Sequence, residues 1–92
     1  MIETFRCQET EALFAGRRIR RLAAIESPAM RNLAMLNRAG RIEDLRVPPG
    51  NRLEALRGDR AGQWSVRIND QWRQCFRFES GNAYDVEIVD YH

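Results

Sequence analysis

The chain has 92 residues, of which 43% are hydrophobic and 30% are charged, a composition typical of folded proteins and unlike that of disordered tails or membrane proteins. A chain of this length builds one small core, so we expect a single domain over residues 1–92. No apolar run approaches about 18 residues, and the opening MIETFRCQET lacks the pattern of a secretory signal. We therefore expect a cytoplasmic protein without membrane contact.

The net charge is only +2, yet all fifteen basic residues are arginine. A planar guanidinium can hold a phosphate by two hydrogen bonds and can stack on bases, which favours a partner that carries phosphate, such as RNA. A GC-rich genome also accounts for the missing lysine, so composition permits RNA binding without requiring it.

The two cysteines, Cys7 and Cys75, are far apart in the sequence and have a single histidine to join them in any metal site. No CxxC spacing is present, so we expect two free thiols that are buried or half-buried, no metal and no cofactor.

The first half of the chain predicts one strand followed by helices. Residues 2–6 alternate as a strand, Thr10 is positioned to cap a short helix over residues 11–15, and Ser27 with Pro28 marks a fresh helix start that Gly40 ends. Apolar residues at spacings of three and four give this second region one buried stripe, formed by Leu22, Ile25, Ala29, Leu33 and Leu36. Residues 41–45 add a further helical turn.

The second half changes to a period of two. After a rigid loop over residues 47–52, strands are predicted at residues 53–56, 64–68, 72–78 and 83–91, separated by tight turns. A strand, two helices and an antiparallel meander predict an α+β fold with the helices on one face of a twisted, mainly antiparallel sheet.

Alternation assigns side chains to the two faces of this sheet. The core face takes Trp64, Val66, Ile68, Trp72, Gln74, Phe76 and Phe78, and the open face takes Ser65, Arg67, Arg73, Cys75 and Arg77. In the last strand Tyr84, Val86 and Ile88 share one face, whereas Asp85, Glu87, Val89 and Tyr91 share the other. Tyr91 is thereby predicted beside Arg73. Gln74 is anomalous, because a buried amide without partners is costly.

The terminal Asp90, Tyr91 and His92 near Arg73 are suited to cleaving RNA. The ribose 2'-hydroxyl is a built-in nucleophile, so the protein must supply a base, an acid and fixed positive charge. His92 and Asp90 can move protons, Arg73 and Arg57 can hold the phosphate, and Tyr91 can stack on a base. A polar chain end and a binding module without catalysis explain the same residues, and both stay open.

Several stretches resemble HigB-type toxins of the RelE/ParE superfamily. They are the opening "MIETFRC", then "PPGNRLEAL" and "NDQWR", and the terminal "VEIVDYH". The resemblance covers nearly the whole chain and implies a RelE-like fold. It also implies the toxin of a type II toxin–antitoxin system, one that cuts mRNA in the ribosomal A site and is inhibited by a helix-turn-helix antitoxin, HigA. The implied activity needs no cofactor.

The resemblance also implies a set of catalytic residues: Glu54, Arg57, Arg73, Asp90, Tyr91 and His92. Some relatives carry histidine where this chain has Glu54, so we expect Asp90 and His92 to do most of the proton transfer, with Glu54 either a base or a group that orients Arg57. The residues expected to contact RNA are Arg52, Arg67 and Arg77. The segment "RRIRR" at residues 17–21 is either a solvated helix face or a contact with ribosomal RNA.

Two other functions are compatible with this fold. A ParE-like toxin would inhibit DNA gyrase without catalysis, and a decayed relative would serve only as a regulatory partner of the antitoxin. Arg73 with the terminal Asp-Tyr-His favours the nuclease, because a gyrase inhibitor has no need of that combination.

Overall fold

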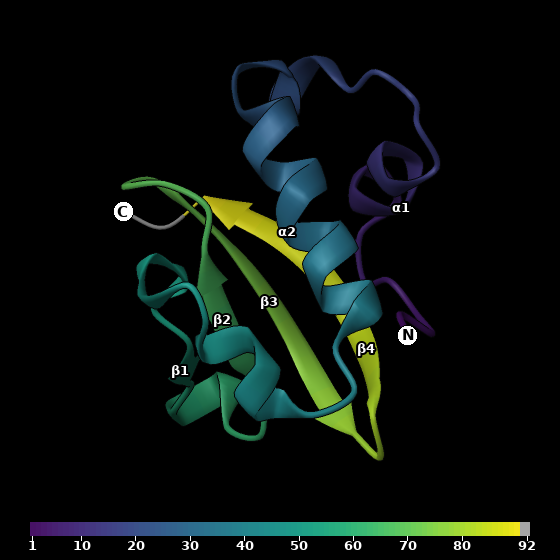
Figure 1. Cartoon of the computed structure of the whole chain (residues 1–92). Helices are drawn as coiled ribbons and strands as arrows, with labels where there is room; N and C mark the ends of the chain where they lie inside the picture. Colours follow the sequence, from purple (N-terminus) through teal and green to yellow (C-terminus); the bar gives the residue numbers. More distant parts are fainter. Residues whose placement is uncertain (91–92) are drawn as a thin grey trace.

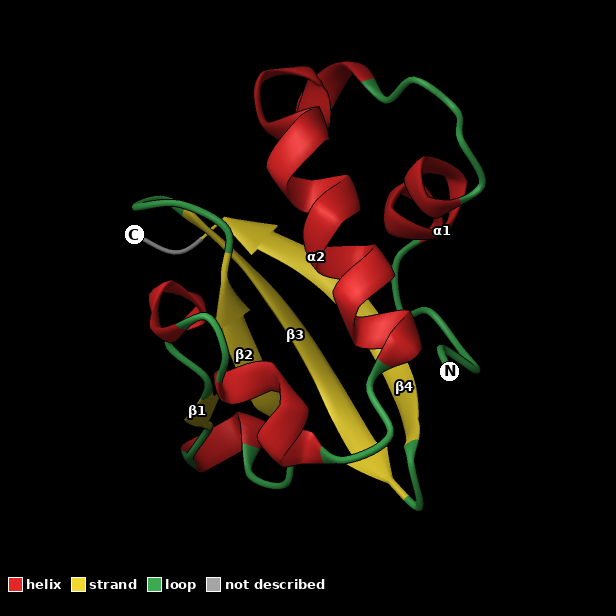
Figure 2. Cartoon of the chain, viewed as in Figure 1, coloured by secondary structure: helices red, strands yellow, loops and turns green. Residues whose placement is uncertain are grey.

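The computed structural model describes residues 1–90, in which helices cover one face of a four-stranded antiparallel sheet (Figure 1). The helices are α1 (Gln8–Phe14) and α2 (Glu26–Arg38), with 3-10 turns η1 (Arg20–Ile25), η2 (Ile42–Arg46), η3 (Pro49–Asn51) and η4 (Gly58–Arg60). The strands are β1 (Glu54–Ala55), β2 (Trp64–Arg67), β3 (Trp72–Glu79) and β4 (Asn82–Asp90), in the spatial order β1-β2-β3-β4. The predicted α+β class and the meander are confirmed (Figure 2).

The core lies between α2 and the sheet, which α2 crosses in Figure 1. The predicted stripe is confirmed, since Leu22, Ile25, Ala29, Leu33 and Leu36 are all at most 4% exposed. The sheet contributes Val66, Phe76, Val86 and Ile88. Each large aliphatic or aromatic side chain buried in this way contributes about 1.5–3 kcal/mol. Asn32 adds one polar link, because its side-chain amide donates to the Arg67 carbonyl at 3.0 Å and ties α2 to β2.

The prediction that Thr10 caps α1 is wrong. The helix begins at Gln8, and Thr10 lies inside it, fully buried. Its hydroxyl accepts a hydrogen bond from the Ile88 backbone N–H at 3.1 Å. This contact with β4 is made across the fold, so Thr10 serves the packing of α1 on the sheet and not the helix end. Similarly, α2 begins at Glu26, one residue before the predicted cap.

The N-terminal segment runs beside β4 in parallel, but as two isolated bridges, Ile2 with Ala83 and Phe5 with Val86, and not as a continuous strand. Four backbone hydrogen bonds of 2.7–3.1 Å between residues 1–6 and residues 83–86 hold it in place. Residues 2–6 therefore lie beside the sheet as predicted, but the prediction that they form a regular strand is wrong.

A β-bulge in β4 overturns the predicted alternation of that strand. The pairing with β3 shifts between Cys75 and Arg77, and Asp85 adopts a left-handed backbone with φ 55°. Aspartate is one of the few residues that tolerate this conformation. As a result Tyr84 pairs with Arg77 on the outer face and does not share the core face with Val86.

Candidate functional site

The sheet face opposite the helices, called the outer face here, carries four of the nine predicted site residues, Glu54, Arg67, Arg73 and Arg77. Pairing places Arg67 of β2 directly opposite Arg73 of β3, and Glu54 of β1 directly opposite Ser65. Glu54 Oε1 lies 3.9 Å from Arg73 Nη2. Two residues predicted to act together are thus neighbours.

Within the described part of the chain, two acceptors hold Arg73 in one orientation. Its Nε donates to Ser65 Oγ at 2.9 Å, and its Nη2 donates to the Arg52 carbonyl at 2.9 Å. The Arg73 side chain is only 15% exposed, whereas that of Glu54 is 60% exposed. The guanidinium is therefore fixed at the rim of the outer face beside an accessible carboxylate.

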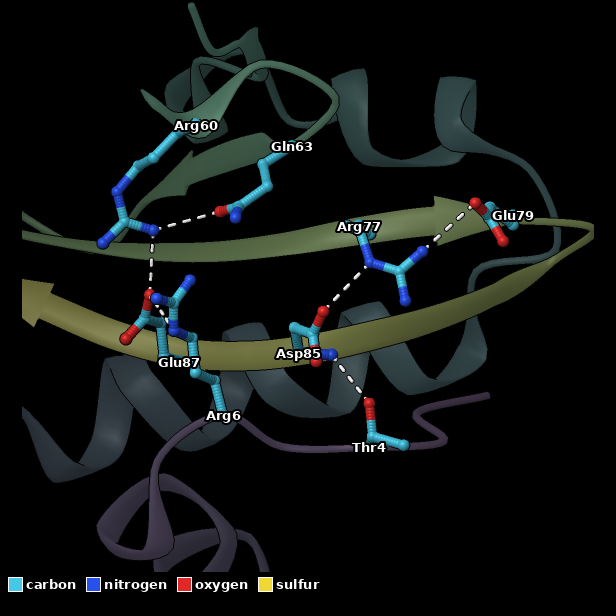
Figure 3. Close-up of polar contacts among 8 residues, drawn as sticks. All are labelled: Thr4, Arg6, Arg60, Gln63, Arg77, Glu79, Asp85 and Glu87. Carbon is cyan, nitrogen blue, oxygen red and sulfur yellow. Dashed lines mark hydrogen bonds and ion pairs between the residues drawn. The ribbon is translucent and has the colours of Figure 1, made fainter. Parts of the chain in front are cut away.

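The other two arginines of this face have their charge balanced by carboxylates. Arg67 forms an ion pair with Asp70. Arg77 bonds Asp85 at 3.0 Å and Glu79 at 3.1 Å (Figure 3), and the hydrogen bond to Asp85 is the largest cause of its raised pKa. Arg77 also lies over the ring of Tyr84, 5.2 Å from its centroid.

Arg60 reaches across the outer face and was not among the predicted site residues. From η4 it extends over β3 to Glu87, with Nη1 to Oε1 at 2.8 Å, and it also bonds Gln63 at 3.0 Å (Figure 3). Arg6 approaches the same carboxylate at 4.0 Å. Cys75, next to Glu87 in the sheet, is fully buried, and burial raises the pKa of its thiol.

Both cysteines are free, as predicted. Ser65 and Cys75 were assigned to an open face, yet both are fully buried. Among residues 1–90, no group of three His, Cys, Asp or Glu side chains is arranged to hold a metal ion.

Three further predicted residues, Arg57, Arg52 and Asp90, are exposed. Arg57 is exposed at the start of η4, and Arg52 is exposed with a left-handed backbone. Asp90 is exposed, pairs with Trp72 and accepts a hydrogen bond from Gln71 Nε2 at 3.1 Å. Because direct partners share a face, Asp90 lies on the Trp72 side of the pleat, and Val89 is the partner of Arg73.

The predicted roles of Tyr91 and His92 lie outside the described residues, as does the expected neighbourhood of Tyr91 and Arg73.

Sequence reasoning missed Ser65 and Arg60 as contributors to the site. The alternation of β2 placed Ser65 on the correct face, but nothing in the sequence indicated that Arg73 would bond it. Arg60 stands in a turn, and only the folded pairing of β3 with β4 brings Glu87 within its reach.

A family model described as a RelE-like toxin of the type II toxin–antitoxin system HigB matches residues 8–92. The curated relatives include "Toxin HigB-1" of Vibrio cholerae, 43% identical over 66 residues, which are 72% of this chain and 70% of the relative. "Endoribonuclease HigB" of Proteus vulgaris is 44% identical over 41 residues, 45% of each chain.

The solved structure of YafQ from E. coli superposes with a TM-score of 0.65 at 12% identity, covering 98% of this chain and 91% of that one. With the family match, this likeness confirms the predicted RelE-like fold. No helix in residues 1–90 is long and apolar enough to cross a membrane.

Proposed function

The chain belongs to the HigB-like family of RelE-like toxins from type II toxin–antitoxin systems, and on that premise we propose that it is a ribosome-dependent endoribonuclease that cuts mRNA in the A site. The name of the Proteus vulgaris relative supports ribonuclease activity. The observation that carries the proposal is the guanidinium of Arg73, fixed on the outer face within 3.9 Å of Glu54.

In the proposed reaction the 2'-hydroxyl of the message attacks the adjacent phosphorus. A base takes the hydroxyl proton, the new 2'-O–P bond forms, and the P–O5' bond breaks as an acid protonates the leaving oxygen. The products are a 2',3'-cyclic phosphate and a 5'-hydroxyl end. The nucleophile belongs to the substrate, so this chemistry requires no metal ion.

We assign the roles as the sequence predicts them. Arg73 and Arg57 bind the phosphate, and Asp90 and His92 transfer the protons while Tyr91 stacks on a base. Glu54 was expected to act either as a base or as a group that orients Arg57, and among residues 1–90 its carboxylate approaches Arg73, at 3.9 Å. We therefore propose that Glu54 orients Arg73.

The distribution of charge supports RNA as the partner. Eight arginines form no ion pair within residues 1–90, and all of them lie in the segment 17–57: Arg17, Arg18, Arg20, Arg31, Arg38, Arg46, Arg52 and Arg57. Uncompensated guanidinium groups are suited to backbone phosphates. We propose that Arg52 and Arg67 contact the message, that Arg77 contributes less because two carboxylates balance it, and that residues 17–20 contact ribosomal RNA.

Membership of a type II family implies a protein antitoxin. We propose that this antitoxin is a HigA-type helix-turn-helix protein, and that both partners act in the cytoplasm, where translation supplies the substrate.

The test compares Arg73→Ala with Arg77→Ala on message bound to programmed ribosomes. Loss of one preorganised donor to the reacting phosphate should slow cleavage about 100- to 1,000-fold, whereas Arg77→Ala should change the rate less than about threefold, because its charge is already balanced. Cleavage is followed by mapping the new 5' ends.

Two results would refute the proposal. Equal rates on naked and ribosome-bound RNA would exclude dependence on the ribosome. Full growth arrest by Arg73→Ala, accompanied by inhibition of gyrase supercoiling in vitro, would favour the ParE-like alternative.

A further inference from the structure

We infer that Ser65 and the backbone carbonyl of Arg52 are positioning groups that aim the Arg73 guanidinium at the scissile phosphate. This inference rests on the proposed function, because it assigns how one phosphate-binding residue of that site is held. Neither group was expected to act in this way, since Ser65 had no predicted role and Arg52 was predicted to contact RNA through its side chain.

Two hydrogen bonds that Arg73 forms with residues 1–90 fix its orientation. They leave from different nitrogens, Nε toward Ser65 Oγ and Nη2 toward the Arg52 carbonyl, each at 2.9 Å. A planar group bonded at two of its nitrogens cannot turn about its bond to the side chain without losing one of them. An arginine prepared in this way does not have to reorganise when negative charge develops on the phosphate.

Ser65 is placed for this purpose at the centre of the sheet. It lies in β2 between Glu54 of β1 and Cys75 of β3 and is fully buried. Serine is uncommon at a buried position in a central strand. Its hydroxyl meets Arg73 as the latter folds back over the outer face, so the bond explains a residue that packing alone would not select.

The Arg52 carbonyl is aimed by a turn that is itself anchored to the core. Arg52 has φ 46° and ψ 56°, directly after η3. The preceding Asn51 is 5% exposed, and its side-chain amide donates to the Leu45 carbonyl at 3.1 Å and contacts Met35 Sδ at 3.2 Å. These contacts attach the turn to α2 and η2, so the helical layer helps to set the direction of the Arg52 carbonyl that Arg73 bonds.

The test uses Ser65→Ala, with Ser65→Thr as the variant that keeps the hydroxyl and Ser27→Ala, an exposed serine in α2, as the matched control. Single-turnover cleavage on programmed ribosomes is measured against toxin concentration. Ser65→Ala should lower the rate at saturating toxin about tenfold to a hundredfold, the effect of one hydrogen bond to a charged group. The half-saturating concentration should be unchanged, because ribosome binding uses other arginines.

Hydrogen exchange of the arginine Nε–H groups, followed by NMR, is a second measurement that does not depend on cleavage. In wild-type protein the Arg73 Nε–H should exchange slowly with water. Ser65→Ala should accelerate that exchange and leave the Nε–H of Arg77 unaltered, whereas Ser65→Thr should keep it slow. Arg73→Lys should cost less in the Ser65→Ala background than in wild type, since the hydrogen bond between Arg73 and Ser65 is already absent there.

An Arg73 resonance unaffected by Ser65→Ala, or additive effects of Ser65→Ala and Arg73→Lys on the rate, would overturn the inference. Wild-type protein that fails to cleave would refute the proposed function instead, and the exchange rates would then still decide whether Ser65 holds Arg73.

Discussion

The side-chain amide of Gln74 allows the cost of burying an unpaired polar group in the core to be measured. It lies in the middle of β3, between Val66 of β2 and Ile88 of β4, and is fully buried on the helix-covered face. Neither its Oε1 nor its Nε2 has a hydrogen-bond partner within the described residues. A polar group buried without a partner forfeits its hydration, which costs about 1–3 kcal/mol.

Gln74→Met removes that cost while keeping an unbranched side chain of similar length, so packing should be preserved. We expect the free energy of unfolding to rise by about 1–2 kcal/mol, which for a chain of this size raises Tm by roughly 5–15 °C. Urea denaturation followed by tryptophan fluorescence measures the change, and an unaltered m-value shows that the extent of unfolding is the same.

The same substitution at Gln63 is the control, because Gln63 Oε1 accepts a hydrogen bond from Arg60 at 3.0 Å and Gln63→Met should not stabilise the protein. If Gln74→Met were less stable than wild type, the amide of Gln74 would have to be satisfied in the folded protein, and the reasoning would fail.

Three further predictions concern buried groups. Thr10→Val leaves the Ile88 N–H without its acceptor and should lower the free energy of unfolding by about 1–3 kcal/mol; Thr10→Ser, which keeps the hydroxyl, should lower it far less in the same urea titration. Cys75 should resist iodoacetamide in the folded protein, and since its pKa is raised by burial, the unfolded thiol loses its proton first. Stability should therefore decline as pH rises above about 8.5, a decline that Cys75→Ala removes in denaturation curves across that range. Arg60→Met removes the cation nearest to the Glu87 carboxylate, which is 14% exposed, and should lower the free energy of unfolding by about 1–3 kcal/mol. An equal loss in a Glu87→Gln background, where the carboxylate is absent, would contradict the ion pair as the cause.

The parts of the fold that follow from local patterns were predictable. The helical stripe ending in Leu33 and Leu36 and the alternation of β2 and β3 are periodic, and both appear in the structure. The bulge at Asp85 was not predictable, because a left-handed aspartate leaves no mark on the apolar pattern. Its effect was to move Tyr84 to the other face.

For the candidate site, the sequence predicted a shared surface for some residues but not the hydrogen bonds between them. Arg73 and Glu54 were expected at one surface, and strand pairing brings them together. The alternation of a strand does not show which side chains are covered by others. Long side chains such as Arg60 fold over the outer face, so small residues assigned to an open surface, Cys75 among them, are buried.

The N-terminal segment beside β4 also affects how the protein can associate. An exposed sheet edge offers unpaired backbone groups that recruit foreign strands and promote aggregation. Here the outer edge of β4 is occupied at Ile2 and Phe5, and the opposite edge is β1, only two residues long. Within residues 1–90, an incoming strand therefore finds few unpaired backbone groups at either edge of the sheet. Side chains are then the main groups that these two edges offer to another protein or to a second copy of the chain.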